Sequence, residues 1–530
     1  MTSDNNTFSL KKIFDEGQKL NDEKKYVEAI KLYKLALVMQ GKNIEKYNLA
    51  ALYIRLANAY YSLDDKDKAA VYYEKYLELY PEGQSSVFTR LAHIYYYIDA
   101  DKSVDYHNKA LNLAPSKYDS CCKLFAMTKS SFYSQQDLKD ESEYEVEKLK
   151  TAFVKNIKQC IHDNKKQEKD KKLNIGYFSS DCYAHTMMNY ILPIWENHNK
   201  EDFDFVIFNG SDKSDATTEK IKKTGIKIVP CANLEDDKIA ELIYKEKIDI
   251  LVDLGGYTHI KSLCFFYKPA PIIILYLGYL NTLGMKEVDY ILTDRYTIPE
   301  EYADLYTEKP LYLDRGYQIF TEKELPELTK CPFEENGYIT YGSFNCSSKL
   351  SDVTIFIWSQ LLLKDKTAKL LLYRTQFNKR VIKNLKSKFK KYGITEDRLI
   401  FDNKPLNPHF RAYSMADISL DSYPFSGMSI AIETALMGVP TVTLVGEGMQ
   451  SRGAGRINSI IGMDKLNANS GEEYISAALK LSENKDILKV LRVTLRDKVN
   501  NSDIRVNPQE FTQDLENKFR KVWQEFTNNP

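Results

Sequence analysis

A repeat with a period of 34 residues occupies the first 115 residues of the chain. The stretches LANAYYSLDDKDKAAVYYEKYLELYP and LAHIYYYIDADKSVDYHNKALNLAP end at Pro81 and Pro115, which are 34 positions apart. Matched pairs within them are Leu56 with Leu91, Ala57 with Ala92, Tyr73 with His107, and Leu77 with Leu111. A period of this length predicts stacked pairs of helices, in which each pair contacts only its neighbours.

An earlier copy of the pattern, KKYVEAIKLYKLALVM, places Ala29, Tyr33 and Leu37 in the corresponding positions. Small residues where helices meet, aromatic residues between pairs and a closing proline resemble the tetratricopeptide repeat. We therefore expect a superhelix of such repeats over residues 1–115, with an unrelated helical bundle as the alternative. Residues 116–172 keep a helical periodicity without a clean repeat and then become charged, which predicts a helical cap and a linker.

Beyond the charged stretch HDNKKQEKDKK, short apolar runs alternate with helical segments. The first series covers residues 173–178, 203–208, 226–229, 248–254, 272–277 and 289–294, and the second covers 338–344, 369–374, 398–401, 417–420 and 440–445. This alternation is typical of parallel sheets wound with helices. It predicts two Rossmann-like lobes of an α/β fold, over residues 173–325 and 326–505, with a cleft between them. A C-terminal helix is expected over residues 506–530.

The composition argues against two classes of partner. Lys and Arg together number 74, as do Asp and Glu, so no global field attracts nucleic acid or a membrane surface. No apolar run of 18 residues occurs, so we expect no membrane span. The eight cysteines form no CxxC pair, which indicates reduced thiols and a cytoplasmic protein.

The stretch SFNCSSK, residues 343–349, follows a predicted strand and closes with Lys349. Ligands of parallel α/β sheets bind at the carboxyl ends of strands, which is where this turn is expected. Lys349 is therefore either a fixed cation for a phosphate or, as is commoner in turns, a solvated loop charge.

A second anion-binding feature is predicted in DSYPFSGMSIAIETALMGVP, residues 421–440, where a helix begins near Met428 and Ser429. The N–H groups of a helix start lack intrahelical partners and attract anions. Gly427 leaves them accessible, and the Ser429 hydroxyl adds a further donor. Glu433, one turn into the helix, either accepts hydrogen bonds from ribose hydroxyls or is an ordinary first-turn acid favoured by the helix dipole.

Two histidines occupy comparable places after predicted strands. His409 lies between the run at 398–401 and the next helix, and His185 in SSDCYAH follows the first strand of the other lobe. A lone histidine is usually structural. These turns and the glycine pair of DLGGYTH nevertheless all fall at carboxyl ends of strands, which outlines one cleft.

Several nucleotide-binding and metal-binding motifs are absent from the sequence, namely GxxxxGKS/T, GxGxxG after a strand, HExxH, and clustered Cys and His ligands. The DxD strings Asp65–Asp67 and Asp99–Asp101 fall in the repeat turns, where they are expected to solvate loops. We therefore expect no cofactor and no metal site.

A series of ordered motifs resembles the O-linked N-acetylglucosamine transferase family, whose members join tetratricopeptide repeats to a two-lobed GT-B glycosyltransferase. The motifs are IGYFSSDCYAH, ILVDLGGYT, KPAPIIILYLGY with DYILTD, SFNCSSK, H-x-R with ADISLDSYPFSG, and ETALMGVPTVTLVGE. The resemblance implies transfer of a sugar, first of all GlcNAc from UDP-GlcNAc, to Ser or Thr of proteins. The reaction is expected to invert the anomeric centre without metal, and the repeats are expected to bind the protein acceptor.

The resemblance also assigns individual residues. Lys349 matches the family lysine that binds the donor diphosphate, His409 matches the histidine beside the donor, and Glu433 matches the acid on the ribose. His185 matches the first-lobe histidine discussed as catalytic, so His185 and Lys349 are the expected catalytic residues. Glu241 loosely matches a first-lobe aspartate proposed as a base.

The chain departs from the family pattern around the expected donor site. Cys346 stands where animal enzymes carry a glutamine, and Ala412 replaces an arginine. The family's His-Thr-Thr reads Met428, Ser429 and Ile430. The expected donor-binding set is Cys346, Lys349, His409, Gly427, Met428, Ser429, Ile430 and Glu433. The departures leave open a different donor (GDP-fucose or UDP-glucose), an asparagine acceptor, or a degenerate enzyme that acts as a repeat scaffold.

Overall fold

The computed structural model describes residues 10–40, 44–154, 160–162, 168–320 and 324–528. Part of the predicted charged linker therefore lies outside the described residues. The chain divides into two compact units, Met1–Asp119 and Ser120–Pro530.

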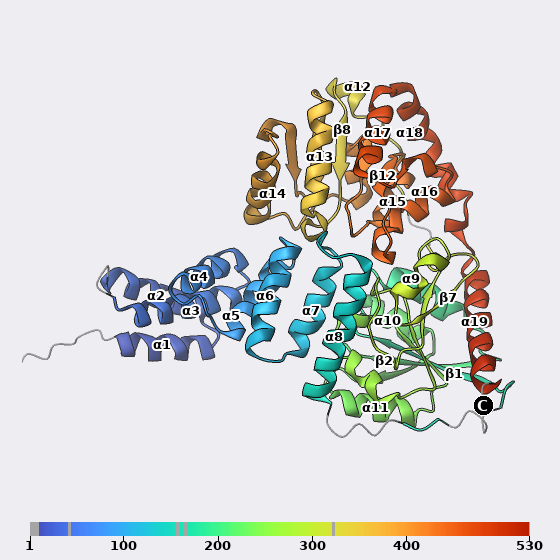
Figure 1. Ribbon diagram of the computed structural model, residues 1–530, viewed down its shortest axis with the longest axis horizontal. Helices are drawn as coiled ribbons and strands as arrows, with labels where there is room; N and C mark the ends of the chain where they lie inside the picture. The colour runs from blue at the N-terminus through green and yellow to red at the C-terminus, as the bar shows by residue number, and fades with distance from the viewer. Residues whose placement is uncertain (1–9, 41–43, 155–159, 163–167, 321–323, 529–530) are drawn as a thin grey trace, which may run out of the picture. The chain divides into compact units, whose positions relative to one another are not determined.

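The first unit contains three pairs of helices within its described residues, which confirms the predicted helical repeats (Figure 1). They are α1 (Leu10–Asp22) with α2 (Tyr26–Gln40), α3 (Lys46–Ser62) with α4 (Lys66–Leu79), and α5 (Ser85–Tyr95) with α6 (Ala100–Leu113). Ala57 and Ala92, which the repeat pattern singles out, are completely buried. Their small side chains permit the close approach that paired helices require.

The aspartates in the turns of the repeats have a structural role that the sequence did not predict. Asp65 accepts a hydrogen bond from the Lys68 N–H at 3.2 Å, and Asp99 accepts one from the Lys102 N–H at 3.3 Å. Each aspartate is therefore the N-cap of the second helix of its repeat, where it satisfies an N–H group that lacks an intrahelical partner. These DxD strings stabilise helix starts.

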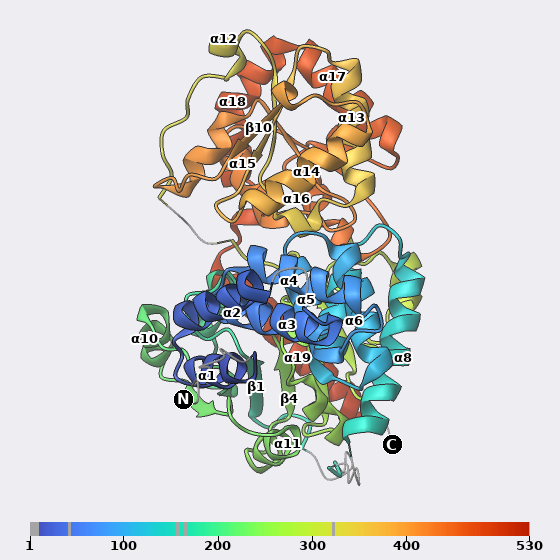
Figure 2. The same cartoon turned by 90° about the vertical axis from the view of Figure 1, so that its left-hand side faces the viewer.

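Two parallel sheets form the core of the second unit (Figures 1 and 2). The strands of the first sheet are β1 (Leu173–Ser179), β2 (Phe203–Asn209), β3 (Lys227–Pro230), β4 (Ile250–Asp253), β5 (Ile272–Leu275), β6 (Tyr290–Thr293) and β7 (Lys309–Tyr312). Those of the second are β8 (Thr340–Ser343), β9 (Lys369–Tyr373), β10 (Leu399–Asp402), β11 (Ile418–Leu420), β12 (Thr441–Leu444) and β13 (Asn467–Ala468). The orders are β3-β2-β1-β4-β5-β6-β7 and β10-β9-β8-β11-β12-β13. Two Rossmann-like lobes are thus observed, as predicted.

Helices gather around both sheets of the second unit (Figures 1 and 2). Before and within the first lobe they are α8 (Gln135–Phe153), α9 (Met188–Asn197), α10 (Ala216–Lys223) and α11 (Asp236–Lys245), while α7 (Lys117–Met127) spans the division between the units. In and after the second lobe they are α12 (Phe333–Asn336), α13 (Asp352–Lys364), α14 (Lys379–Lys391), α15 (Met428–Leu436), α16 (Gly453–Ile460), α17 (Gly471–Glu483), α18 (Lys485–Asn500) and α19 (Pro508–Asn528). Because both sheet faces are covered, the central strands β4 and β5 are buried at every residue. Strand β5 is entirely apolar, and β4 is apolar up to Asp253 at its end.

All eleven predicted strands occur, but β7 and β13 were not predicted. Both lie at the edge of their sheet. Strand β7 reads KPLY, and a proline inside a run argues against a strand except at an edge, where its missing N–H costs no ladder bond. Strand β13 has only two residues, too few for a period to be visible.

Two buried polar contacts connect the lobes and the C-terminal helix. Arg456 of α16 donates from Nε to Asp294 Oδ2 at 2.5 Å, which joins the second lobe to the residue after β6. Burial opposes the charge on Asp294, but Arg456 and hydrogen bonds from Thr297 together outweigh burial and lower the pKa of this carboxyl. Helix α19 returns to the first lobe, where Glu516 Oε1 lies 2.9 Å from His198 Nδ1. No helix in the described parts of the chain is long and apolar enough to cross a membrane.

Candidate functional site

Lys349 follows β8 at the carboxyl end of the second sheet, in the short 3-10 helix η6 (Ser347–Lys349). Its ammonium donates to Ser426 O at 3.2 Å and lies 4.3 Å from the centre of the Phe425 ring. Burial lowers the pKa of Lys349, and the charges of Cys346 and Asp421 offset this only in part. Because Ser426 directly precedes the start of α15, the cation stands beside that helix start.

Helix α15 begins at Met428, where the sequence predicted it. Its hydrogen-bond ladder opens with Ala431, whose N–H donates to Gly427 O at 2.8 Å. The N–H groups of Met428, Ser429 and Ile430 precede this ladder at the positive end of the helix dipole. Such a helix start binds anions. Two anion-binding features, the Lys349 ammonium and the start of α15, therefore lie side by side.

Gly427 does more than leave this helix start accessible. Its N–H donates to Asp421 Oδ1 at 2.8 Å, and a Cβ atom there would come within 2.6 Å of Asn345 Oδ1. Asp421 also accepts hydrogen bonds from Ser426 Oγ at 2.6 Å and Thr443 Oγ1 at 2.8 Å. The glycine therefore permits a tight buried turn in which Asp421 fixes the residues that precede the helix.

Three cations act on the Cys346 thiol, namely Lys129, Lys349 and Arg374, and we call them the cation cluster. Lys129 lies in the turn after α7, and Arg374 follows β9. Burial alone would raise the pKa of Cys346, but the cluster and the Ser348 hydroxyl together outweigh burial and lower it. Burial lowers the pKa of Lys129 to about 8, with Lys349 acting in the same direction and Cys346 and Cys122 opposing it.

Two tyrosines of the first lobe contact the start of α15. Tyr190 OH lies 2.5 Å from Ser429 Oγ, and Tyr317 OH donates to Met428 Sδ at 3.5 Å. Burial raises the pKa of Tyr190 to about 12, so its hydroxyl keeps its proton at neutral pH. The first lobe therefore contacts two of the three residues that replace the family's His-Thr-Thr.

The remaining departures from the family pattern lie at the hydrophobic core of the second lobe. Ala412 is buried in a cluster that includes Phe344 and Tyr413, and Ile430 is partly buried against the same cluster. An arginine at position 412 would have to place its guanidinium in this apolar core, where an unpaired charge is costly. The alanine therefore fits the packing of this chain.

His409 and Glu433 are brought together. His409, at the start of the 3-10 helix η8 (His409–Met415), places Nε2 3.3 Å from Glu433 Oε2, and Tyr413 OH donates to the same oxygen at 2.6 Å. The Glu433 side chain is 10% exposed and that of His409 58% exposed. Tyr413 therefore orients a buried carboxylate while the histidine ring stays accessible to solvent.

His185 is separate from this group in its contacts. Its Nδ1 lies 3.5 Å from Asp181 Oδ2 and accepts the Met187 N–H at 3.3 Å. These partners belong to its own turn after β1, and the ring is 41% exposed. Glu241 pairs with Lys238 on the exposed face of α11. The catalytic role of His185 stays a prediction.

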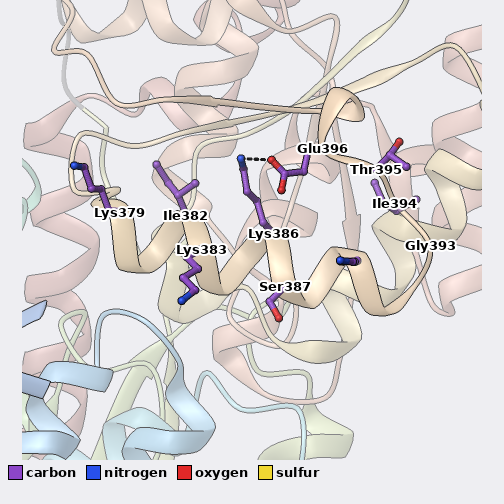
Figure 3. Close-up of a pocket in the computed structure, with 10 residues that line it drawn as sticks. Lys379, Ile382, Lys383, Lys386, Ser387, Gly393, Ile394, Thr395 and Glu396 are labelled. Atoms are coloured by element: carbon purple, nitrogen blue, oxygen red, sulfur yellow. Dashed lines mark hydrogen bonds and ion pairs between the residues drawn. The ribbon is translucent and has the colours of Figure 1, made fainter. Parts of the chain in front are cut away.

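A further basic feature lies away from the predicted residues, in a hollow of about 770 Å³ along α14 and the turn that follows it (Figure 3). The lysines that line it are Lys379, Lys383, Lys386 and Lys390. Lys386 pairs with Glu396 at 2.5 Å, drawn as a dashed line in Figure 3. Most of these side chains are exposed to water, which is how a solvated basic helix face is built. In the cation cluster, by contrast, Lys129 is buried and Lys349 and Arg374 are half-buried.

The chemistry at the carboxyl end of the second sheet suits a doubly or triply charged anion. A lysine, a helix start and a hydroxyl converge there, and these are the groups that hold phosphates in proteins. Among the described residues, no group of three or more His, Cys, Asp or Glu side chains is placed to hold a metal ion.

Two Rossmann-like lobes behind helical repeats, with an anion-binding end on the second sheet, define a GT-B fold joined to a repeat domain. A solved O-GlcNAc transferase from Thermobaculum terrenum has this fold, with a TM-score of 0.81, 23% identity and 99% of each chain covered. The GT-B architecture expected from the sequence is thereby confirmed. The chain belongs to glycosyl transferase family 41, whose profile matches residues 141–331 and 330–515.

Curated relatives agree with this membership. A protein of Oryza sativa subsp. japonica named "Probable UDP-N-acetylglucosamine--peptide N-acetylglucosaminyltransferase SPINDLY" is 30% identical over 371 residues, 67% of this chain and 39% of the relative. The Arabidopsis thaliana relative of the same description named SEC is 27% identical over 371 residues, 67% of this chain and 37% of the relative. The chain thus spans about two fifths of the length of the curated relatives it matches.

Sequence reasoning missed several residues around the helix start. Asp421 had a visible signal, since an acid at the carboxyl end of a buried strand in DSYPFSG is well placed to fix the following turn. Tyr190 and Lys129 had no such signal in the sequence. Tyr190 sits in an apolar helix like any core aromatic, and Lys129 lies more than two hundred residues before its neighbours Cys346 and Lys349 in a segment without a motif.

Proposed function

We propose that this protein is an inverting, metal-independent O-glycosyltransferase that moves GlcNAc from UDP-GlcNAc to Ser or Thr of protein acceptors. Membership of glycosyl transferase family 41 and the activities for which the SPINDLY and SEC relatives are named support the reaction class. The position of Lys349 beside the start of α15 is the observation that carries the proposal. A diphosphate leaving group gains charge there as the glycosidic bond breaks.

In this proposal the second lobe holds the donor. Lys349 and the N–H groups at the start of α15 stabilise the charge that develops on the β-phosphate, a role that a divalent cation fills in other transferases. Glu433, oriented by Tyr413, is placed to accept hydrogen bonds from the ribose, and His409 lies beside it. His185 is the first-lobe candidate for work at the acceptor hydroxyl.

The repeats are proposed to bind the acceptor. Stacked helix pairs present an extended concave surface, which suits a peptide segment. The predicted donor-binding residues all lie beyond residue 172, so removal of residues 1–115 should reduce protein glycosylation more than donor hydrolysis. Equal loss of both activities in a folded truncation would contradict a role of the repeats in acceptor binding.

The proposed function is tested by a donor screen in EDTA. The purified protein is incubated with cell lysate and, separately, UDP-GlcNAc, UDP-glucose or GDP-fucose, and acceptor peptides are analysed by mass spectrometry. We expect the mass of one N-acetylhexosamine on Ser or Thr with UDP-GlcNAc. Transfer that occurs only after Mn²⁺ or Mg²⁺ is restored would contradict metal independence, and no transfer from any donor would favour a scaffold.

A related transferase with another donor is the second candidate. The observation in its favour is that Met428 and Ser429 are already engaged by Tyr317 and Tyr190 of the first lobe. A thioether and a partly buried Ile430 offer the sugar and nucleotide only apolar contact where the family has an imidazole and a hydroxyl. The same donor screen separates the two candidates.

A further inference from the structure

Positive charge is concentrated in helix α14 of the second lobe. Its 13 residues, KRVIKNLKSKFKK, contain no Asp or Glu, and seven of them are Lys or Arg. The whole chain, by comparison, has 74 basic and 74 acidic residues. The helix therefore creates a positive local field on a protein whose net charge is zero, and such a field attracts a negatively charged partner.

Four of these side chains form a single row, which we call the lysine stripe: Lys379, Lys383, Lys386 and Lys390. At 3.6 residues per turn, their positions fall within about 60° of one another around the helix axis. All four line the hollow along α14 that Figure 3 shows. The apolar residues that α14 buries occupy a different face, so the stripe is directed away from the core of the lobe.

The hollow itself contains an example of the group that the stripe accepts. Among the described residues that line it, Glu396 is the one acid, and its carboxylate pairs with Lys386. The Glu396 side chain is 72% exposed. Because an exposed pair of this kind contributes little to stability, an incoming carboxylate replaces Glu396 at small cost. Lys388 differs, since it lies outside the stripe and pairs with Asp352 of α13 at 2.9 Å.

The stripe begins at the edge of the sheet that carries the proposed donor site. Strand β9 runs parallel to β8, so both strands end at the same edge. Lys349 follows β8 there, and α14 begins at Lys379, shortly after β9 ends. A helix that connects parallel strands runs back along the sheet, so the stripe leads away from this edge. It spans about 16 Å at 1.5 Å per residue, the length of about five residues of extended peptide.

The shape and composition of the hollow favour a peptide over other polyanions. A membrane attracts basic segments through a flat anionic surface, whereas the stripe lines a hollow of about 770 Å³. Single-stranded nucleic acid stacks its bases on aromatic side chains, and none of the described residues that line the hollow is aromatic. Ile382 and Ile394 instead offer apolar contact to an extended peptide.

We propose that the lysine stripe docks an acidic segment of the protein acceptor, a stretch of about five residues rich in Asp and Glu near the Ser or Thr that receives the sugar. This inference rests on the proposed function and adds to it a class of acceptor. It gives the second lobe a part in acceptor choice, in addition to the part proposed for the repeats. Because the stripe is largely exposed, added salt weakens the docking.

The experiment measures by fluorescence anisotropy how the full chain binds two labelled peptides. One peptide has a run of glutamates beside a Ser acceptor sequence, and the other has glutamines in their place. The test variant combines Lys383→Glu with Lys390→Glu, both at exposed positions of the stripe. The matched control combines Lys391→Glu with Lys480→Glu, which change the net charge equally at exposed positions outside the hollow. Circular dichroism checks that both variants are folded.

We expect the wild type to bind the glutamate peptide about 10-fold more tightly than the glutamine peptide at about 0.1 M salt. The test variant should lose this preference, and about 1 M salt should remove it from the wild type. In transfer assays the test variant should raise the KM for the glutamate peptide about 10-fold, with kcat and the KM for the donor unchanged. The control variant should match the wild type.

Equal binding of the two peptides by the wild type, or an equal loss in the test and control variants, would overturn the inference. So would binding of single-stranded DNA or phosphatidylserine vesicles that depends on Lys383 and Lys390 more strongly than peptide binding does. Sugar transfer that charge reversal leaves unchanged would remove the docking surface and leave the proposed function standing. Stripe-dependent peptide binding without sugar transfer from any donor would instead remove the proposed function and support the docking surface.

Discussion

Two buried lysines that lie six positions apart, Lys123 and Lys129, have pKa values shifted in opposite directions. Lys123 lies in α7 and donates to Glu141 and to Glu145, the latter at 2.9 Å. Burial opposes its charge, but the two carboxylates outweigh burial and raise its pKa. Lys129 lies in the turn after α7 among other cations, and burial lowers its pKa to about 8.

The difference lies in the groups that act on each lysine, which are two carboxylates for Lys123 and the cation Lys349 with two thiols for Lys129. A buried lysine with two carboxylates is complete within the fold, and Ser120 adds a hydrogen bond to Glu145 at 2.7 Å. Burial and the charge of Lys349 both disfavour the charged form of Lys129. Groups with perturbed pKa values are frequent at binding and catalytic sites.

The largest expected effect tests this contrast through stability. Lys123→Met leaves Glu145 buried without its main partner and should cost about 3–5 kcal/mol of unfolding free energy. Lys129→Met should cost nothing or stabilise the protein at neutral pH. The folded-state pKa of Lys129 lies below its ordinary value of 10.5, so its protonated form is penalised below about pH 8 and the penalty fades as the pH rises toward 10.5.

Urea unfolding of the two variants at neutral pH measures this difference. A loss of stability in Lys129→Met as large as in Lys123→Met would show that both lysines are structural, and the comparison would fail.

The second prediction concerns the charge that Lys349 supplies to the leaving group. Lys349→Ala should reduce sugar transfer by about 10²–10³-fold with the fold intact, because one charge-stabilising donor is removed from the leaving group. The measurement is single-turnover transfer, with circular dichroism as the control for folding. Turnover near that of the wild type would remove Lys349 from the reaction.

The third prediction sharpens the account of donor choice. Met428→His combined with Ile430→Thr should shift the preference toward UDP-GlcNAc by about 5- to 150-fold, the value of a buried polar group that regains its partner. Competitive turnover of paired donors by both proteins measures the ratio. An unchanged ratio would mean that these side chains do not reach the part of the donor that differs.

The smallest expected effect lies where the lobes meet. Tyr190→Phe removes the hydroxyl 2.5 Å from Ser429 Oγ and should raise the KM for the donor by about 2- to 12-fold, since Ser429 loses the partner that orients it. The kcat should stay constant. A change in kcat with constant KM would show that Tyr190 takes part in the chemical step.

Most of the fold could be predicted because its signals are local. The 34-residue period and the alternation of apolar runs with helices identify the repeats and both sheets. The strands that the sequence did not predict, β7 and β13, lie at sheet edges. An edge strand tolerates a proline such as Pro310 in β7. The capping role of Asp65 and Asp99 depends on where a helix begins, which the pattern fixes only within a few residues.

Residues of the candidate site could be predicted where they lie in the turn that directly follows a strand, as for Lys349 and the start of α15. It was not predictable where distant segments meet. Lys129, Tyr190 and Tyr317 reach the second lobe from residues far back in the chain, and no spacing in the sequence encodes those contacts. Tertiary packing alone brings them together.

The most direct test of the central claim is calorimetric titration of the wild-type protein with UDP and with uridine, in EDTA at neutral pH. The account predicts that UDP binds at least about 100-fold more tightly than uridine, because Lys349 and the N–H groups at the start of α15 interact with the diphosphate, which uridine lacks. Equal affinities for UDP and uridine, or UDP binding that appears only when Mg²⁺ or Mn²⁺ is added, would contradict it.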